Sequence, residues 1–142
     1  MYFCNLLAQP MRSVMTTQTT DGVKVSIETV YQPEYSNPEN EHYMFAYKVR
    51  IENQSANRIQ LLRRHWFIFD SKGPKREVEG EGVVGLQPVI EPGEQHEYIS
   101  GCNLKSDMGS MEGTYLMSRE VDGVTFSVKI PKFILIPPYR LN

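Results

Sequence analysis

The sequence predicts an all-β protein, an antiparallel β-sandwich of about seven to nine strands, immunoglobulin-like or fibronectin type III-like. Apolar and polar residues alternate with a period of two from Gly22 onward, and turn signals recur at short intervals. The gaps between these signals leave no room for several crossover helices. We expect one domain over residues 21–142, preceded by a flexible leader over residues 1–20, where the sequence has no such periodicity.

Four segments carry the strand prediction. Alternating apolar residues mark three of them, VKVSI (23–27), YMFAYKVRI (43–51) and VTFSVKI (124–130). The fourth, IQLLRRHWFIFD (59–70), fits either a strand or an amphipathic helix. Its β-branched and aromatic content, and the short loop that joins it to the preceding strand, favour a hairpin. We therefore predict a fourth strand, with Trp66 in the core and Arg63 and Arg64 on opposite faces of the sheet.

Three short segments between the predicted strands carry turn signals. EPGE (91–94) has Pro and Gly at the central positions of a type II turn, and VDGV (121–124) carries an Asp-Gly hairpin signal. DSKGP (70–74) combines the same kinds of turn residue. These turns connect short antiparallel strands and support the sandwich.

Composition excludes several classes of protein. The chain has 142 residues, with 15 basic and 17 acidic side chains and no basic tract, which argues against nucleic-acid binding. The longest clean apolar run, residues 133–136, is too short to span a membrane. Cys4 and Cys102 form no Cys/His cluster, so we expect two unpaired thiols, no zinc and a cytoplasmic location.

The segment EGEGVVG contains Gly80, Gly82 and Gly85 at the G-x-G-x-x-G spacing of dinucleotide-binding proteins. That motif works because its glycines lead into a helix whose N-terminus meets the pyrophosphate. Pro88 and the turn at 91–94 leave no space for such a helix. We therefore expect residues 80–85 to lie in a strand, bulge or loop, with no helix beginning between residues 83 and 91.

The sequence contains no evident catalytic set. His65 and His96 could in principle form a metal site with carboxylates, but no pair of them sits at ligand spacing. Ser100 and Cys102 in YISGC do not form a nucleophile elbow that His42, His65 or His96 could serve. We expect neither catalysis nor a metal site nor a cofactor. A histidine on a strand is more often a packing or surface residue.

Four long stretches of the chain resemble the ApaG family: YQPEYSNPENEHYMFAYKVRIEN (31–53), RRHWFIFDSKG (63–73), REVEGEGVVGLQPVIEPGEQHEYISGC (76–102) and GSMEGTYLM (109–117). The resemblance implies a fibronectin type III-like sandwich over about residues 22–136. In eukaryotes such domains are attached to F-box proteins and occur in a polymerase delta-interacting protein, which implies protein binding. A gene neighbour that hydrolyses diadenosine tetraphosphate and a proposed link to cobalt and magnesium resistance accompany the family, without an established biochemical activity.

We expect a non-catalytic protein-interaction module that binds a protein partner. The sequence leaves open whether the protein forms a homodimer. The predicted partner-binding residues lie on one loop, where glycines permit close backbone approach: Gly80, Glu81, Gly82, Val83, Val84 and Gly85. If Glu81 and Val83 are exposed, charge-changing substitutions there should weaken binding without unfolding the protein. The alternatives are that the glycines only turn the chain, that the loop has a phosphate- or nucleotide-linked role, or that the protein acts in cobalt and magnesium resistance.

Overall fold

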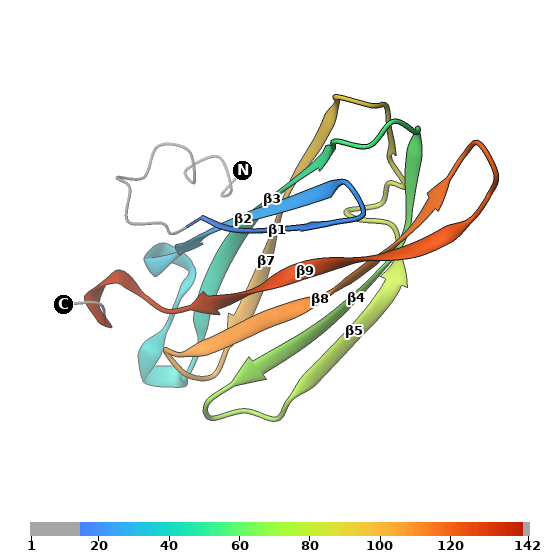
Figure 1. Ribbon diagram of the computed structural model, residues 1–142. Coiled ribbons are helices and arrows are strands. Elements are labelled where there is room, and N and C mark those ends of the chain that lie inside the picture. The colour runs from blue at the N-terminus through green and yellow to red at the C-terminus, as the bar shows by residue number, and fades with distance from the viewer. Residues whose placement is uncertain (1–14, 141–142) are drawn as a thin grey trace.

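The computed structural model describes residues 15–140, which form an antiparallel sandwich of two sheets, as the sequence predicts (Figure 1). Nine strands lie within this range: β1 (Thr16–Thr20), β2 (Val23–Tyr31), β3 (Tyr43–Asn53), β4 (Ile59–Asp70), β5 (Arg76–Glu81), β6 (Val89–Ile90), β7 (Gln95–Leu104), β8 (Gly109–Arg119) and β9 (Thr125–Leu135). The first sheet has the order β1-β2-β3-β7. The second has the order β5-β4-β8-β9, with β6 also paired to β4.

Helical structure in this part of the chain consists of three single 3₁₀ turns, at Pro33–Tyr35, Pro38–Asn40 and Pro138–Arg140. Two of them stand in the connection between β2 and β3, where proline supplies the φ angle that a helical first turn requires. Over residues 15–140, no helix has the length and apolar character needed to cross a membrane.

The first strand corrects the expected boundary of the leader. Thr16–Thr20 pairs in antiparallel register with β2, so the sandwich begins before residue 21. The Thr20 hydroxyl also accepts a hydrogen bond from the Lys129 amide of β9, at 3.2 Å, and β1 thereby closes one side of the sandwich (Figure 1). Threonine favours strands, but this edge strand has no apolar alternation to reveal it. Residues 1–14 of the expected leader lie outside the described residues.

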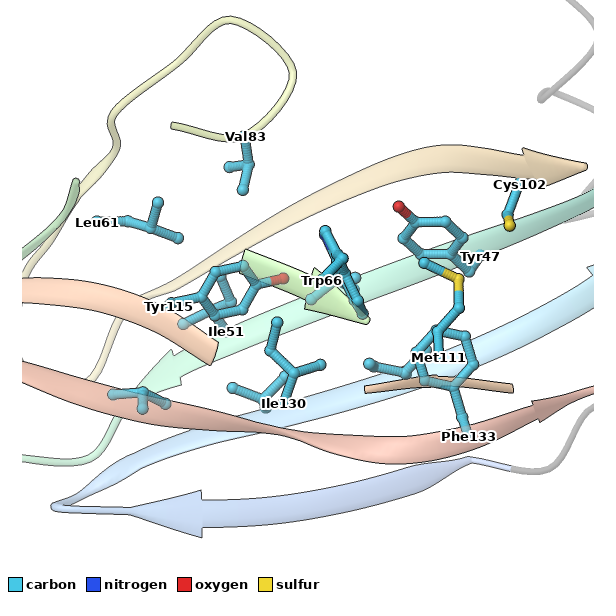
Figure 2. Close-up of a cluster of buried hydrophobic side chains, with 14 of the residues drawn as sticks. Tyr47, Ile51, Leu61, Trp66, Val83, Cys102, Met111, Tyr115, Ile130 and Phe133 are labelled. Atoms are coloured by element: carbon cyan, nitrogen blue, oxygen red, sulfur yellow. The ribbon is translucent and has the colours of Figure 1, made fainter. Parts of the chain in front are cut away.

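Trp66 lies in the core, as predicted, with 3% of its surface exposed. The rings of Tyr47, Tyr115 and Phe133 meet it edge-on, with centroids at 5.5, 6.4 and 5.9 Å. Figure 2 shows the indole in the middle of a cluster that draws side chains from both sheets. Edge-to-face aromatic pairs add to the hydrophobic stabilisation, so this cluster joins the two layers of the sandwich.

Two irregularities shift the alternation of the second sheet. The β4–β8 register slips between Leu61 and Arg63, and the β8–β9 register slips between Met111 and Gly113. After the first slip Arg63 is exposed while Arg64 faces the sandwich interior opposite the buried Tyr115. The two arginines therefore lie on opposite faces, as expected. β-Bulges of this kind re-aim side chains in ways that a strict period of two cannot predict.

Asp70, at the end of β4, is a buried carboxylate held by hydrogen bonds. It accepts them from the Lys105 amide at 2.7 Å, the Ser106 hydroxyl at 2.7 Å and the Lys72 amide at 3.2 Å. Burial raises the pKa of Asp70, but the hydrogen bonds outweigh burial and the net pKa lies below its ordinary value. The carboxylate thus joins the end of β4 to the loop that follows β7.

We expect Asp70→Asn to lower the free energy of unfolding by about 1–3 kcal/mol at neutral pH, because an amide cannot accept all these bonds. The folded pKa lies below the unfolded one, so this stabilisation is complete above the unfolded value of about 3.9 and is lost as the pH falls through the folded value. Urea denaturation from pH 7 to pH 3 should show the difference from wild type shrinking. The exposed control Glu112→Gln should show no such trend, and a pH-independent deficit in Asp70→Asn would contradict the assignment.

Candidate functional site

The two sides of the sandwich differ. β5 and β7 are the edge strands of their sheets and lie on the side opposite the contact between β1 and β9. A cleft of about 380 Å³ opens there, lined mainly by side chains from the inner faces of β4, β5 and β7 and by the loop after β5. We call this cleft the open side. It combines two unpaired strand edges of the described sandwich with access to the core.

The predicted glycine loop forms one wall of the open side. Val83 and Leu86 exchange backbone hydrogen bonds of 2.8 and 3.0 Å around a two-residue turn. Both central residues, Val84 and Gly85, have positive φ angles, of 47° and 77°, which is the geometry of a type I′ hairpin turn. The chain then enters the short strand β6. The prediction that no helix begins between residues 83 and 91 is confirmed.

This turn does not resemble a phosphate cradle. The amides of Gly82, Val83 and Leu86 donate to protein carbonyls. Gly82 has a φ of 65°, and a β-carbon there would stand 2.2 Å from the Leu86 carbonyl oxygen. A β-carbon at Gly80 would meet the Arg64 guanidinium at 2.8 Å. These glycines therefore make room for the returning chain and for an arginine, which supports the structural alternative for them.

Val83, one of the predicted partner-binding residues, does not meet the condition that it be exposed. Its side chain is 1% exposed and belongs to the core, so it cannot contact a partner (Figure 2). The neighbouring side chains carry the accessible apolar surface instead, since Val84 is 63% and Leu86 57% exposed. Glu81 is exposed, so the predicted loop presents Glu81, Val84 and Leu86 in place of Glu81 and Val83.

Two arginines that the sequence analysis did not select line the open side. Arg64 Nη1 donates to the carbonyls of Glu81 and Gly82, at 2.9 and 3.0 Å. Arg76 donates to the Asn103 carbonyl and so joins the edge strands β5 and β7. The bulge in β4 turns the Arg64 side chain inward. Both guanidiniums use their fork of donors to hold backbone carbonyls.

The ionisable side chains of the open side are mostly neutral at physiological pH. Burial raises the pKa of the Cys102 thiol, although the Arg76 charge opposes this effect, so the thiolate that a nucleophile requires is disfavoured. Burial likewise raises the pKa of Tyr98 and Tyr115, whose hydroxyls share a hydrogen bond. Cys102 is a free thiol, as predicted, while Cys4 lies outside the described residues. The cleft therefore offers apolar surface, neutral hydroxyls and two fixed cations.

A second group of ionisable side chains lies on the outer face of β4 and β5. His65 Nε2 stands 2.7 Å from a carboxylate oxygen of Glu77 and 3.8 Å from one of Glu79. The three ligand atoms all lie within 4.8 Å of one another. This arrangement is not visible in the sequence, because only the pairing of the two strands brings the histidine and the carboxylates together. We call these three residues the His65 cluster.

The chain is similar in sequence to proteins of one family. The sequence pattern of the ApaG domain matches residues 33–119. The chain is 46% identical over 128 residues to Protein ApaG of Anaeromyxobacter dehalogenans (strain 2CP-C), and 48% identical over 128 residues to Protein ApaG of Nitrosomonas europaea. Each alignment covers 90% of this chain and 100% of the relative.

A solved structure supports the same relationship. The crystal structure of a protein described as ApaA from Bordetella pertussis is 43% identical, with a TM-score of 0.78, and the match covers 88% of this chain and 98% of that one. The pattern match and the identities extend over most of the chain, as the resemblance of the four quoted stretches implies. The chain belongs to the ApaG domain family.

Proposed function

We propose that this protein is a non-catalytic protein-interaction module that binds an extended segment of a partner at the open side. The observation that carries this proposal is the juxtaposition there of two unpaired strand edges, an accessible cleft and an exposed apolar turn. Extended peptides commonly bind by adding to a sheet edge, where main-chain hydrogen bonds supply affinity and pockets for side chains supply specificity. The reduced Cys102 thiol suits the cytoplasmic location expected from the sequence.

The apolar residues of the open side favour a partner segment that brings apolar side chains. Val84 and Leu86 project from the turn, and Val78 projects from the inner face of the edge strand β5. Val84 and Val78 both line the cleft. Contact with a partner would bury these side chains and contribute about 25 cal/mol for each Å² of apolar surface removed from water. Loops on a rigid scaffold are frequent binding sites, and this turn is fixed by its own hydrogen bonds.

The chemistry of the cleft supports binding rather than catalysis. The Cys102 thiol and the Tyr98 and Tyr115 phenols favour their neutral forms, so none of them is activated as a nucleophile or base. Arg64 and Arg76 already bind backbone carbonyls. The phosphate- or nucleotide-linked alternative gains no support from the turn, because most of its backbone donors are used within the fold.

The double variant Val84→Asp, Leu86→Asp is expected to fold normally and to lose partner binding. Both side chains are exposed, so the free energy of unfolding should change by no more than about 0.5 kcal/mol at each position. Two buried charges at the contact should weaken binding at least tenfold. Peptides selected from a random phage-displayed library against the wild-type protein provide the ligand, and their affinities for both proteins provide the measurement.

Val121→Asp is the matched control, because Val121 is 75% exposed on the turn between β8 and β9. It should bind the selected peptides as wild type does. Selected peptides that bind the double variant and the wild type equally would exclude the turn. A library that yields no specific peptide would contradict recognition of an extended segment.

A further inference from the structure

We infer that the His65 cluster is a surface site for a divalent transition-metal ion of the Zn²⁺ type, held by one imidazole nitrogen and two carboxylate oxygens. The inference is independent of the proposed function, since the cluster lies on the outer face of the second sheet and the open side uses the inner face. No cofactor or metal was expected from the sequence, in which Glu77 and Glu79 follow His65 by 12 and 14 residues.

The distances between the three ligand atoms fit such an ion. Zn²⁺ binds nitrogen and oxygen ligands at about 2.0–2.2 Å, which places two ligands of a tetrahedral site about 3.4 Å apart. The observed separations from His65 Nε2, 2.7 Å to Glu77 and 3.8 Å to Glu79, lie on either side of this value. Both carboxylates are more than half exposed and can rotate freely enough to take up the difference. Only side-chain torsions need to change for the ion to bind.

The backbone holds the three residues in place. Glu79 is the direct cross-strand partner of His65, and Glu77 lies two residues before Glu79 on the same face of β5. β4 is paired on both sides, with β5 and with β8, so the Cα atom of His65 is fixed within a sheet. The imidazole also stacks on Phe67, with ring centroids 4.5 Å apart. A preformed arrangement of this kind reduces the entropy that binding must overcome.

The charges of the cluster favour a cation. Within residues 15–140, the ion pairs of Glu77 and Glu79 both involve His65, and no lysine or arginine forms a salt bridge with either carboxylate. A metal ion binds the unprotonated imidazole, so the three ligands together would then carry a charge of minus two, which a divalent ion balances. Nitrogen ligation selects zinc-like ions over Mg²⁺, which prefers oxygen ligands and retains its waters.

The surface next to the cluster leaves space for the remaining ligands of the ion. Glu77 also lines a hollow of about 690 Å³ that runs beside Phe67 and Phe69, and the basic side chains of Lys75, Arg76 and Lys132 line it too. Three protein ligands with an accessible further position are the arrangement in which water or another small ligand completes the coordination. The site would therefore bind an exchangeable ion rather than enclose a structural one.

Isothermal titration of the tag-free full chain with Zn²⁺ tests the inference. We expect one ion per chain, and at least about tenfold weaker binding in His65→Ala and in the isosteric variant Glu77→Gln, Glu79→Gln. His42→Gln, which lies outside the cluster, is the control that should bind as wild type does. Mg²⁺ at the same concentrations should give no saturable binding.

A spectroscopic measurement separates ligation from an effect on folding. In ¹H–¹⁵N spectra of the imidazoles, saturating Zn²⁺ should shift His65 Nε2 and leave His42 and His96 unchanged. The melting temperatures of the variants without metal should stay close to that of wild type, because the side chains are on the surface. Zn²⁺ binding of equal affinity in the Glu77→Gln, Glu79→Gln variant, or no shift of the His65 resonance, would overturn the assignment.

Discussion

Trp66→Ala is expected to lower the free energy of unfolding by about 3–5 kcal/mol, the largest effect of any single truncation in this core. The indole is buried between the two sheets and meets three aromatic rings edge-on. Removing it deletes the apolar contacts and leaves a cavity that a packed sandwich cannot fully close. Urea denaturation followed by far-ultraviolet circular dichroism measures the loss, since the substitution removes the tryptophan fluorescence.

Phe67→Ala is the matched control. Phe67 is the next residue on the same strand but is exposed on the outer face, so its truncation leaves no cavity in the core. Its loss of stability should be well below that of Trp66→Ala. A similar loss for both variants would mean that Trp66 does not join the two layers as its contacts indicate.

Gly82→Ala is expected to cost about 2–5 kcal/mol, far more than the chemically identical change at Gly85. Both glycines have left-handed backbone angles, which cost alanine about 1–2 kcal/mol. At Gly82 the new methyl group would also stand 2.2 Å from the Leu86 carbonyl, so the turn must open, at a further cost of about 1–3 kcal/mol. At Gly85 the methyl group would enter open space.

The comparison of these two variants is made by urea denaturation of each against wild type. If Gly82→Ala loses clearly more stability, the glycine spacing is a requirement of the turn. Equal losses at the two positions would mean that backbone conformation alone explains the glycines and that the close approach of the chain at Gly82 carries no cost.

The sequence predicts the fold well where one physical pattern dominates. The alternation in 23–27 and 43–51 corresponds to β2 and β3, whose inner residues are buried. The ambiguous segment 59–70 is a strand along its whole length, as its β-branched and aromatic content indicates. Burial of one face of a sheet strongly constrains the register of its strands, so the spacing of apolar residues in the sequence is enough to predict these strands.

Features that depend on register or on loop geometry could not be predicted. The bulge in β4 decides which of the two arginines faces inward. It directs Arg64 into the open side, where its partners are backbone carbonyls. A type I′ turn directs Val83 inward and Val84 outward, and a six-residue loop has no periodicity to show this. The His65 cluster exists only once Glu79 is placed opposite His65.

The path of the chain between β3 and β7 has a consequence for how the protein reaches its fold. These strands are hydrogen-bonded neighbours, yet the chain between them forms β4, β5 and β6 on the other sheet before it returns. The first sheet therefore cannot be completed by local hairpin closure, and a long loop must close before the pairing of β7 contributes energy. Topologies dominated by such distant pairings fold on the order of milliseconds to seconds, and the edge of β3 stays uncovered until β7 pairs with it.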